Sequence, residues 1–301
     1  MVYHKPVLLK ESIDGLNIRQ GGIYVDLTFG GGGHSREILS RLGKGGRLIA
    51  FDQDADAEAE AQKIADSRFM FIRSNFRFFR NFLKYYNINL VDGIIADLGV
   101  SSHHIDEPLR GFSFRMSGRP DMRMNRDSSF TALDILNEYS CEELKKVFRF
   151  YGEVNNADKI ANTIVDYRAK REFIDVAGFI EAISSCIPQR QENKYLAKVF
   201  QALRIEVNKE LEVLKQMLLQ VLLSLDKEGR LVVISYHSLE DRIVKNFMRT
   251  GKPEGDIDKD FFGNPLVPFV LVTRKVIIPD EKEVETNTRA RSARLRVAKR
   301  N

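Results

Sequence analysis

The stretch that most constrains the fold of this chain is 23–34, where a short apolar run leads into four consecutive glycines. Residues 23–25 are typical of a buried β-strand, Asp26 follows them, and residues 35–42 place their apolar side chains on one helical face. A strand, a glycine turn and a helix in this order let the backbone approach a nucleotide-like ligand closely. In open α/β sheets such ligands lie beyond the carboxyl ends of the strands. The sequence therefore predicts an α/β fold with a ligand site at this turn.

The spacing of the glycines distinguishes between cofactor classes. A dinucleotide fingerprint needs G-x-G-x-x-G, but its third glycine position falls on Ser35 or Arg36. The pattern Asp-x-x-x-Gly-x-Gly fits instead, from Asp26 through Gly30 to Gly32. This pattern resembles the first motif of class I methyltransferases.

A second acid supports the same site. Residues 47–52 predict the next strand, whose last residue, Asp52, stands 20 positions after Gly32. An acid at this offset is suited to accept hydrogen bonds from ribose hydroxyls. We therefore predict that Asp52 binds the ribose of a nucleoside-containing cofactor.

Strands and helices keep alternating beyond this unit. Apolar runs at 68–73 and 91–97 predict a third and a fourth strand, and the fourth ends in another acid, Asp97. The alternation predicts a doubly wound sheet. Phe76, just after the third strand, lies where an adenine ring would sit in such a fold, although a core phenylalanine fits the pattern equally well.

The alternation stops after residue 104. Residues 107–127 show no periodicity and are rich in glycine, proline, arginine and methionine, and the signals that follow are helical to about residue 203. Long connections inside compact domains are usually functional or disordered, and the aromatic residues here argue against disorder. We predict an inserted all-helical domain at 105–204, within an α/β domain formed by 1–104 and 205–301.

The last hundred residues return the chain to the sheet. A long amphipathic helix is predicted at 205–225, followed by a turn at Gly229 and a fifth strand at 228–235. Segments 269–278 and 292–298 are candidates for final antiparallel strands.

Composition limits the class of protein. The chain has 301 residues, 43% hydrophobic and 30% charged, as in ordinary globular proteins. It contains no apolar run of the ~20 residues that span a bilayer and no signal-peptide pattern near Met1. Its two cysteines lack metal-ligand spacing, which favours a cytoplasmic protein without structural zinc. A net charge of +5 is compatible with nucleic-acid binding.

Several longer motifs are spread nearly end to end along the chain. They are His4-Lys-Pro-Val-Leu-Leu, Asp26-Leu-Thr-Phe-Gly-Gly-Gly-Gly-His34, Asp97-Leu-Gly-Val-Ser-Ser102, Arg110-Gly-Phe-Ser-Phe114, Asp121-Met-Arg-Met124, Ser235-Tyr-His-Ser-Leu-Glu-Asp-Arg242 and Ala290-Arg-Ser-Ala-Arg-Leu-Arg296. Through them the chain resembles the MraW/RsmH family of S-adenosylmethionine-dependent ribosomal RNA methyltransferases, which methylate the exocyclic N4 amine of a small-subunit cytosine.

The resemblance implies a class I (Rossmann-like) methyltransferase sheet with S-adenosyl-L-methionine as cofactor. It implies small-subunit (16S) ribosomal RNA as partner, within an assembled or assembling subunit, and leaves open a monomer or a homodimer. Carried over by position, the cofactor contacts fall on Gly32, Gly33, His34, Asp52, Phe76, Asp97 and His104. The family usually has glutamine where this chain has His104. His34 is suited to donate to the cofactor carboxylate, or is a plain residue at a helix start.

Asp97 is the candidate catalytic residue. The cytosine amine is a poor nucleophile because its lone pair is delocalised, and an acceptor aimed at an N–H favours localisation of that pair as the new bond forms. The sequence leaves three roles open for Asp97: contact with the target amine, contact with the methionine moiety, or capping of a turn. His237 and Ser238, after the fifth strand, are candidates to line the base pocket, and Ser238 is also expected to cap the next helix.

The irregular segment is the candidate RNA-binding surface. Arginines interleaved with phenylalanines suit a surface that grips phosphates and stacks on unpaired bases. The predicted substrate-binding residues here are Arg110, Phe112, Arg115 and Arg119, with Phe114, Arg123 and Arg126 beside them.

Three other functions compete with RNA methylation. A small-molecule methyltransferase would use the same sheet, and an NAD-linked enzyme is disfavoured by the missing third glycine. A non-catalytic RNA-binding or ribosome-assembly protein could retain the cofactor fold, although the intact glycine turn and strand-end acids speak against it. The sequence shows no metal-ligand set and leaves any metal requirement open.

Overall fold

The computed structural model describes residues 6–100 and 107–301, which form two compact units. One comprises Met1–Gly99 and Leu211–Asn301, and we call it the sheet unit. The other, Val100–Glu210, is here called the helical unit. Within the described ranges, no helix has both the length and the apolar character that a membrane crossing requires.

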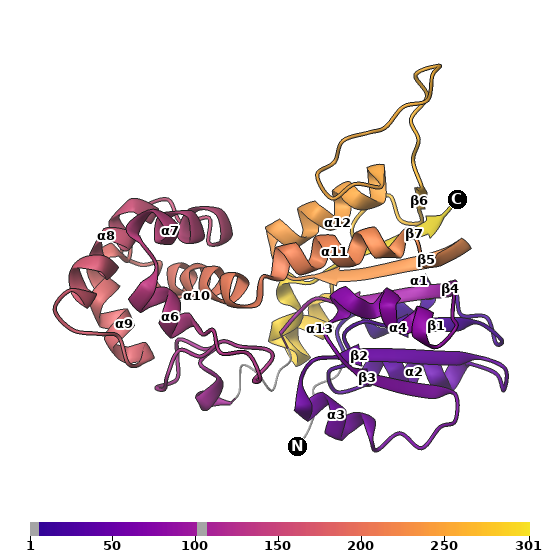
Figure 1. Cartoon of the computed structure of the whole chain (residues 1–301), viewed down its shortest axis with the longest axis horizontal. Coiled ribbons are helices and arrows are strands. Elements are labelled where there is room, and N and C mark those ends of the chain that lie inside the picture. The colour runs from indigo at the N-terminus through magenta and orange to yellow at the C-terminus, as the bar shows by residue number, and fades with distance from the viewer. Residues whose placement is uncertain (1–5, 101–106) are drawn as a thin grey trace. The chain divides into compact units, whose positions relative to one another are not determined.

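The sheet unit is a seven-stranded sheet with helices on both faces (Figure 1). Its strands are β1 (Ile23–Asp26), β2 (Arg47–Asp52), β3 (Phe69–Arg73), β4 (Val91–Asp97), β5 (Leu225–Ser235), β6 (Phe269–Leu271) and β7 (Arg294–Arg300). Its helices are α1 (Leu9–Leu16), α2 (Gly33–Arg41), α3 (Ala55–Ala61), η1 (Phe76–Phe78), α4 (Phe79–Tyr85), α11 (Glu210–Val221), α12 (Ser238–Thr250), α13 (Glu281–Thr286) and η5 (Thr288–Ser292).

The strand order is β3-β2-β1-β4-β5-β7-β6. β1 to β5 pair in parallel, and β7 lies antiparallel to both β5 and β6. The order runs down from β3 to β1 and then turns to β4, so the pair β1–β4 is the point where the topology switches direction. In sheets of this kind the ligand crevice opens beyond the carboxyl ends of the strands at that point.

Alternation along the central strands explains why both faces are covered. In β5, Leu231 and Val233 belong to a core that α4, α11 and α12 complete, whereas Val232 and Ile234 belong to a second core with α1 and α2. Side chains that alternate across a strand can be apolar on both sides only when helices cover both faces.

The helical unit contains, among its described residues, no strand. Its elements are η2 (Pro108–Arg110), α6 (Ala132–Glu138), α7 (Cys141–Lys146), η3 (Val147–Tyr151), α8 (Ala157–Arg168), α9 (Val176–Ile183), η4 (Ser184–Cys186) and α10 (Glu192–Asn208). Thr131 and Ser140 form capping boxes with Asp134 and Glu143, which fixes where α6 and α7 begin. The helices enclose a core of their own.

The predicted fold class, an α/β methyltransferase-type sheet with an inserted all-helical part, is confirmed by this topology. Two boundaries were predicted wrongly. The single helix expected at 205–225 is divided at Lys209, whose φ of +50° ends α10. The fifth strand begins at Leu225, and Gly229 lies inside it, where the pairing with β4 is irregular.

Candidate functional site

The candidate site lies at the carboxyl ends of β1, β2 and β4, where the topology switches. β1 ends at Asp26, β2 at Asp52 and β4 at Asp97, and the first pairs with both neighbouring strands. The order of the strands therefore brings three acids, far apart in sequence, to one edge of the sheet.

The glycine turn after β1 is backbone packed too closely for side chains. Gly32 has a φ of +75°, and a Cβ there would lie 2.6 Å from Phe29 Cζ. A Cβ on Gly33, the first residue of α2, would lie 2.0 Å from Pro6 Cγ. At Gly30, with a φ of +52°, a Cβ would meet nothing within 4 Å. The turn is thus packed against the protein on one side and open at Gly30, as a site for a ligand close to the backbone requires.

Asp26 holds the turn together. Its side chain is buried, with Oδ2 accepting from the Ser35 hydroxyl at 2.6 Å and Oδ1 from the Thr28 N–H at 3.1 Å. Burial raises its pKa above the usual range, and the Ser35 hydrogen bond opposes that shift. Since both oxygens bond within the turn, Asp26 is a scaffold residue of the motif.

Asp52 ties the end of β2 to the glycine turn. Its Oδ2 accepts from the Gly30 N–H at 2.8 Å and its Oδ1 from the Asp54 N–H at 3.0 Å. The side chain is only half-buried, and each carboxylate oxygen has a second lone pair. The predicted ribose-binding role is compatible with these bonds and stays a prediction.

His34 is held by the chain itself. The imidazole is buried, and its Nε2 lies 3.2 Å from the carbonyl oxygen of Val7. Burial lowers its pKa, which favours the neutral ring. Because a carbonyl oxygen only accepts, Nε2 carries the proton of the neutral ring and Nδ1 is an acceptor. The predicted donation from His34 to the cofactor carboxylate would need a doubly protonated ring, and it stays a prediction.

Asp97 has the least satisfied carboxylate of the three strand-end acids. Its backbone N–H donates to Thr28 Oγ1 at 2.6 Å, and its carboxylate accepts from the Tyr236 hydroxyl and the Gly99 N–H. Its Oδ1 atom is buried and accepts no hydrogen bond from any described residue. Burial raises the pKa of Asp97 to about 6, and the Tyr236 bond opposes the shift.

Tyr236 is fixed over the backbone that follows β4. A Cβ on Gly99 would lie 2.7 Å from Tyr236 Cε2, so only glycine allows the ring this close. Desolvation and the neighbouring Asp97 raise the pKa of the Tyr236 phenol, which keeps it protonated and donating. The sequence analysis missed Tyr236, because only the order of the strands in the sheet brings the end of β5 beside the end of β4.

His237 and Glu240 complete the start of α12. The N-cap is His237, whose Nδ1 accepts from the Glu240 N–H at 3.4 Å, so the predicted cap at Ser238 was wrong. Ser238 is instead the first helical residue. The Glu240 carboxylate is buried and accepts from the Tyr236 N–H at 3.0 Å. His237 Nε2 lies 3.2 Å from Glu240 Oε1, so both ring nitrogens of His237 face Glu240.

Phe76 and His104 are the remaining predicted cofactor contacts. Phe76 begins η1 and is partly buried against the sheet core, as expected for a packing residue and compatible with an adenine contact. His104 lies outside the described residues.

In the helical unit, the arginine-rich segment is divided between scaffold and surface. Arg110 is 3% exposed and its guanidinium donates to the Arg123 carbonyl at 2.8 Å, which corrects the prediction that it grips phosphate. Arg123 is paired with Asp121 at 2.6 Å. The segment folds back on itself, so Arg110 supplies a donor to one of its carbonyls and Arg123 pairs with one of its carboxylates.

The remaining predicted residues of this segment lie nearer the surface. Phe112 and Phe114 are partly buried against the helical core. Arg115 is exposed, with its guanidinium carbon 5.8 Å from the Phe114 ring centroid. Arg119 and Arg126 are exposed as well.

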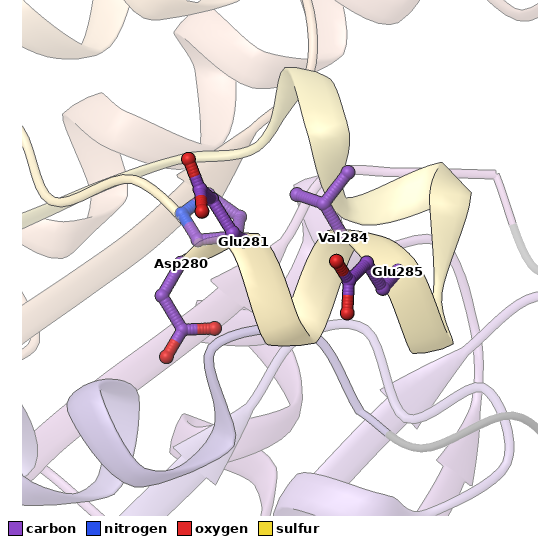
Figure 2. Close-up of a pocket in the computed structure, with 5 residues that line it drawn as sticks. Asp280, Glu281, Val284 and Glu285 are labelled. Carbon is purple, nitrogen blue, oxygen red and sulfur yellow. The ribbon is translucent and has the colours of Figure 1, made fainter.

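A pocket elsewhere in the sheet unit lies on α13 (Figure 2). Its lining consists of Pro279, Asp280, Glu281, Val284 and Glu285. Three carboxylates and no cation in the lining would repel a carboxylate or phosphate ligand. We therefore assign no function to this pocket.

The fold and the site together define a class. A doubly wound sheet with a glycine turn and acids at its switch point is suited to hold a nucleoside-containing ligand, and the glycine spacing is that of a methyltransferase.

Comparison with known proteins identifies the family. The chain belongs to the MraW methylase family, whose model matches residues 1–301. The predicted resemblance is thereby confirmed, and with it the methyltransferase class and its S-adenosylmethionine cofactor.

Curated relatives align over nearly their whole length. A ribosomal RNA small subunit methyltransferase H from Bacteroides thetaiotaomicron is 57% identical over 300 residues, covering 100% of this chain and 98% of the relative. Proteins of the same name are 56% identical in Bacteroides fragilis, covering 99% and 97%, and 56% identical in Parabacteroides distasonis, covering 99% and 97%.

Proposed function

We propose that this protein methylates the exocyclic N4 amine of one cytosine in small-subunit ribosomal RNA, using S-adenosylmethionine. Family membership and relatives named ribosomal RNA small subunit methyltransferase H support the reaction class and the RNA. The observation that carries the proposal for the amine is the buried Oδ1 of Asp97, which has no hydrogen-bond donor among the described residues.

The residues around the glycine turn fit the cofactor. Bound S-adenosylmethionine supplies an electrophilic methyl group on a sulfonium. The open backbone at Gly30, beside the tightly packed Gly32 and Gly33, would receive the cofactor, and Asp52 would accept from its ribose hydroxyls. Phe76, at the end of β3, would cover the adenine.

Asp97 would act on the target base. Its Oδ1 would accept from an N–H of the cytosine amine, which would hold the nitrogen in place and favour localisation of its lone pair. As the nitrogen–carbon bond forms and the sulfur–carbon bond breaks, the Asp97 carboxylate would receive the proton that the amine loses. The Tyr236 hydroxyl and the Gly99 N–H keep the carboxylate oriented. Because the acceptor must be ionised, its raised pKa of about 6 predicts activity that rises with pH through that value.

The cofactor and the RNA would be bound by different parts of the chain. The segments 1–104 and 205–301 would bind the cofactor, and 105–204 would recognise the RNA, chiefly through Arg115 and Arg119. These side chains are exposed, and arginines beside aromatic rings suit phosphate contact and base stacking. A base inside structured RNA must be turned out of its stack before a buried carboxylate can reach it. His237 and Ser238 would line the pocket that receives it.

The test uses the natural partner. Small subunits lacking the modification are incubated with methyl-labelled cofactor, and the nucleosides of their RNA are separated. The proposal predicts one labelled nucleoside, N4-methylcytidine. Label on another atom or base would refute the assignment, and no label with intact RNA binding would favour a non-catalytic assembly protein.

A further inference from the structure

The segment 251–268 forms a long loop that extends away from α12 and β6 (Figure 1). It carries two exposed phenylalanines. Phe261 is 98% exposed and Phe262 is 85% exposed. Their ring centroids lie 5.6 Å apart in an edge-to-face arrangement. Ile257 and Leu266, on the two sides of the same loop, are exposed as well. We call residues 257–266 the aromatic tip.

Hydrogen bonds fix the backbone of the aromatic tip as a turn. Asp260 Oδ1 accepts from the N–H groups of Phe262 at 2.9 Å and Asn264 at 2.8 Å, and Oδ2 accepts from Asn264 Nδ2 at 2.9 Å. The Asp260 N–H donates to the Asn264 carbonyl at 2.9 Å, and Gly263 supplies the positive φ of +85°. These bonds order the backbone without burying either ring. Apolar side chains held in this way are typical of contact sites, because their ordering cost is met before a partner arrives.

The charge of the loop indicates the kind of partner. The chain as a whole carries +5, but 251–268 contains four acids and two lysines, a net charge of −2. Lys252 is paired with Asp258 at 2.7 Å, and Lys215 of α11 is paired with Glu254 at 3.1 Å. Lys259 is the other lysine of the loop. Proteins that stack aromatic rings on single-stranded RNA do so in positively charged grooves. An acidic loop would be repelled by phosphates and attracted by a protein rich in lysine and arginine.

We propose that the aromatic tip docks on a basic protein of the small ribosomal subunit, with Phe261 and Phe262 entering an apolar pocket rimmed by cations. The inference rests on the proposed function, because the subunit that carries the target cytosine is also where such RNA-neutralising proteins are found. Aromatic anchors in a desolvated pocket usually dominate the binding energy of an interface, and the acids around them would select the partner.

The test compares two forms of the substrate. The dissociation constant is measured for unmodified small subunits and for protein-free small-subunit RNA, with the wild type and the double variant Phe261→Ser/Phe262→Ser. We expect binding to subunits to weaken at least about tenfold, as for loss of two interface anchors, while binding to bare RNA stays unchanged. The matched control is Tyr85→Ser, another aromatic residue that is 77% exposed, which should alter neither constant.

Two outcomes would overturn the proposal. Unchanged binding to subunits would show that the aromatic tip has no partner there, and an equal loss on bare RNA would show that it contacts RNA. A melting temperature within about a degree of wild type guards against misfolding, since both rings are exposed. Wild-type protein that binds subunits but does not methylate them would refute the proposed function alone.

Discussion

The glycine turn and the arginine-rich segment look equally functional in the sequence, yet their polar side chains are used differently in the structure. At the glycine turn, Asp52 bonds the backbone but stays half-buried, and Asp97 keeps one oxygen without a donor from the described residues. In the segment 110–126, Arg110 is buried and Arg123 is paired with Asp121. The first region leaves one carboxylate oxygen of Asp97 without a donor from the described residues, whereas the second uses part of its charge on its own folding.

The difference follows from the way each region is positioned. Residues at the carboxyl ends of parallel strands reach the same edge of the sheet whatever their sequence separation. No comparable rule fixes which side chains of an irregular connection turn inward, because that depends on which carbonyls are left without donors. Arg110, enclosed by carbonyls of the same segment, illustrates this.

The largest expected effect is at Asp97. Asp97→Asn should lower the single-turnover rate of methylation roughly 100-fold, as for loss of a positioned acid–base group, with cofactor affinity retained. Rapid quench with labelled cofactor, beside calorimetry of cofactor binding, measures both. A parallel fall in affinity would move Asp97 to the methionine moiety instead.

A measurement of stability serves as the control for the Asp97→Asn variant. Burial raises the pKa of Asp97 to about 6 from the ordinary 3.8, so the folded protein binds this proton more tightly than the unfolded chain. Stability therefore falls as pH rises between these values, and the cost is fully present above pH 6. The melting temperature of Asp97→Asn at neutral pH should equal or exceed that of wild type, and a clear drop would attribute the lost activity to misfolding.

The next effect sharpens the contrast within the arginine segment. Arg110→Ala leaves the Arg123 and Met124 carbonyls without this donor and should lower the free energy of unfolding by about 1–3 kcal/mol. Arg119→Ala, at an exposed position, should change it by less than about 0.5 kcal/mol. Urea denaturation measures both, and equal losses would contradict the division into scaffold and surface.

The third effect concerns the cofactor. Asp52→Ala should weaken cofactor binding by about 1–3 kcal/mol, since it removes a charged acceptor. Asp52→Asn is the control, because it removes the charge while its amide oxygen can still accept from one of the two backbone N–H groups, that of Gly30 or that of Asp54. Calorimetry that finds wild-type affinity in both variants would remove Asp52 from the cofactor site.

The smallest effect is expected at the exposed arginines. The double variant Arg115→Ala/Arg119→Ala should flatten the salt dependence of RNA binding by up to about two phosphate contacts, because each contact releases counterions. Cofactor affinity and melting temperature should stay the same. Filter binding over a salt series tests this, and an unchanged slope accompanied by earlier melting would make the whole segment scaffold.

These regions show which features of the fold and of the candidate site the sequence could predict. Strand-end acids, the glycine turn and the helical insertion were predictable because periodicity and strand polarity determine them. The bond between Tyr236 and Asp97 was not, since it joins residues of β4 and the β5–α12 connection that only sheet order makes neighbours. The break at Lys209 was also hidden, because the apolar pattern of 205–225 continues through a left-handed residue.

The pH dependence of kcat/KM between about pH 5 and about pH 8 tests the central claim, that ionised Asp97 at the switch point acts on the target amine. Because this parameter reports the free enzyme, the account predicts a tenfold loss per pH unit below the Asp97 pKa of about 6 and a level profile above it. The inflection should be absent from the residual activity of Asp97→Asn. A level profile in the wild type, or the same inflection in the variant, would contradict the account.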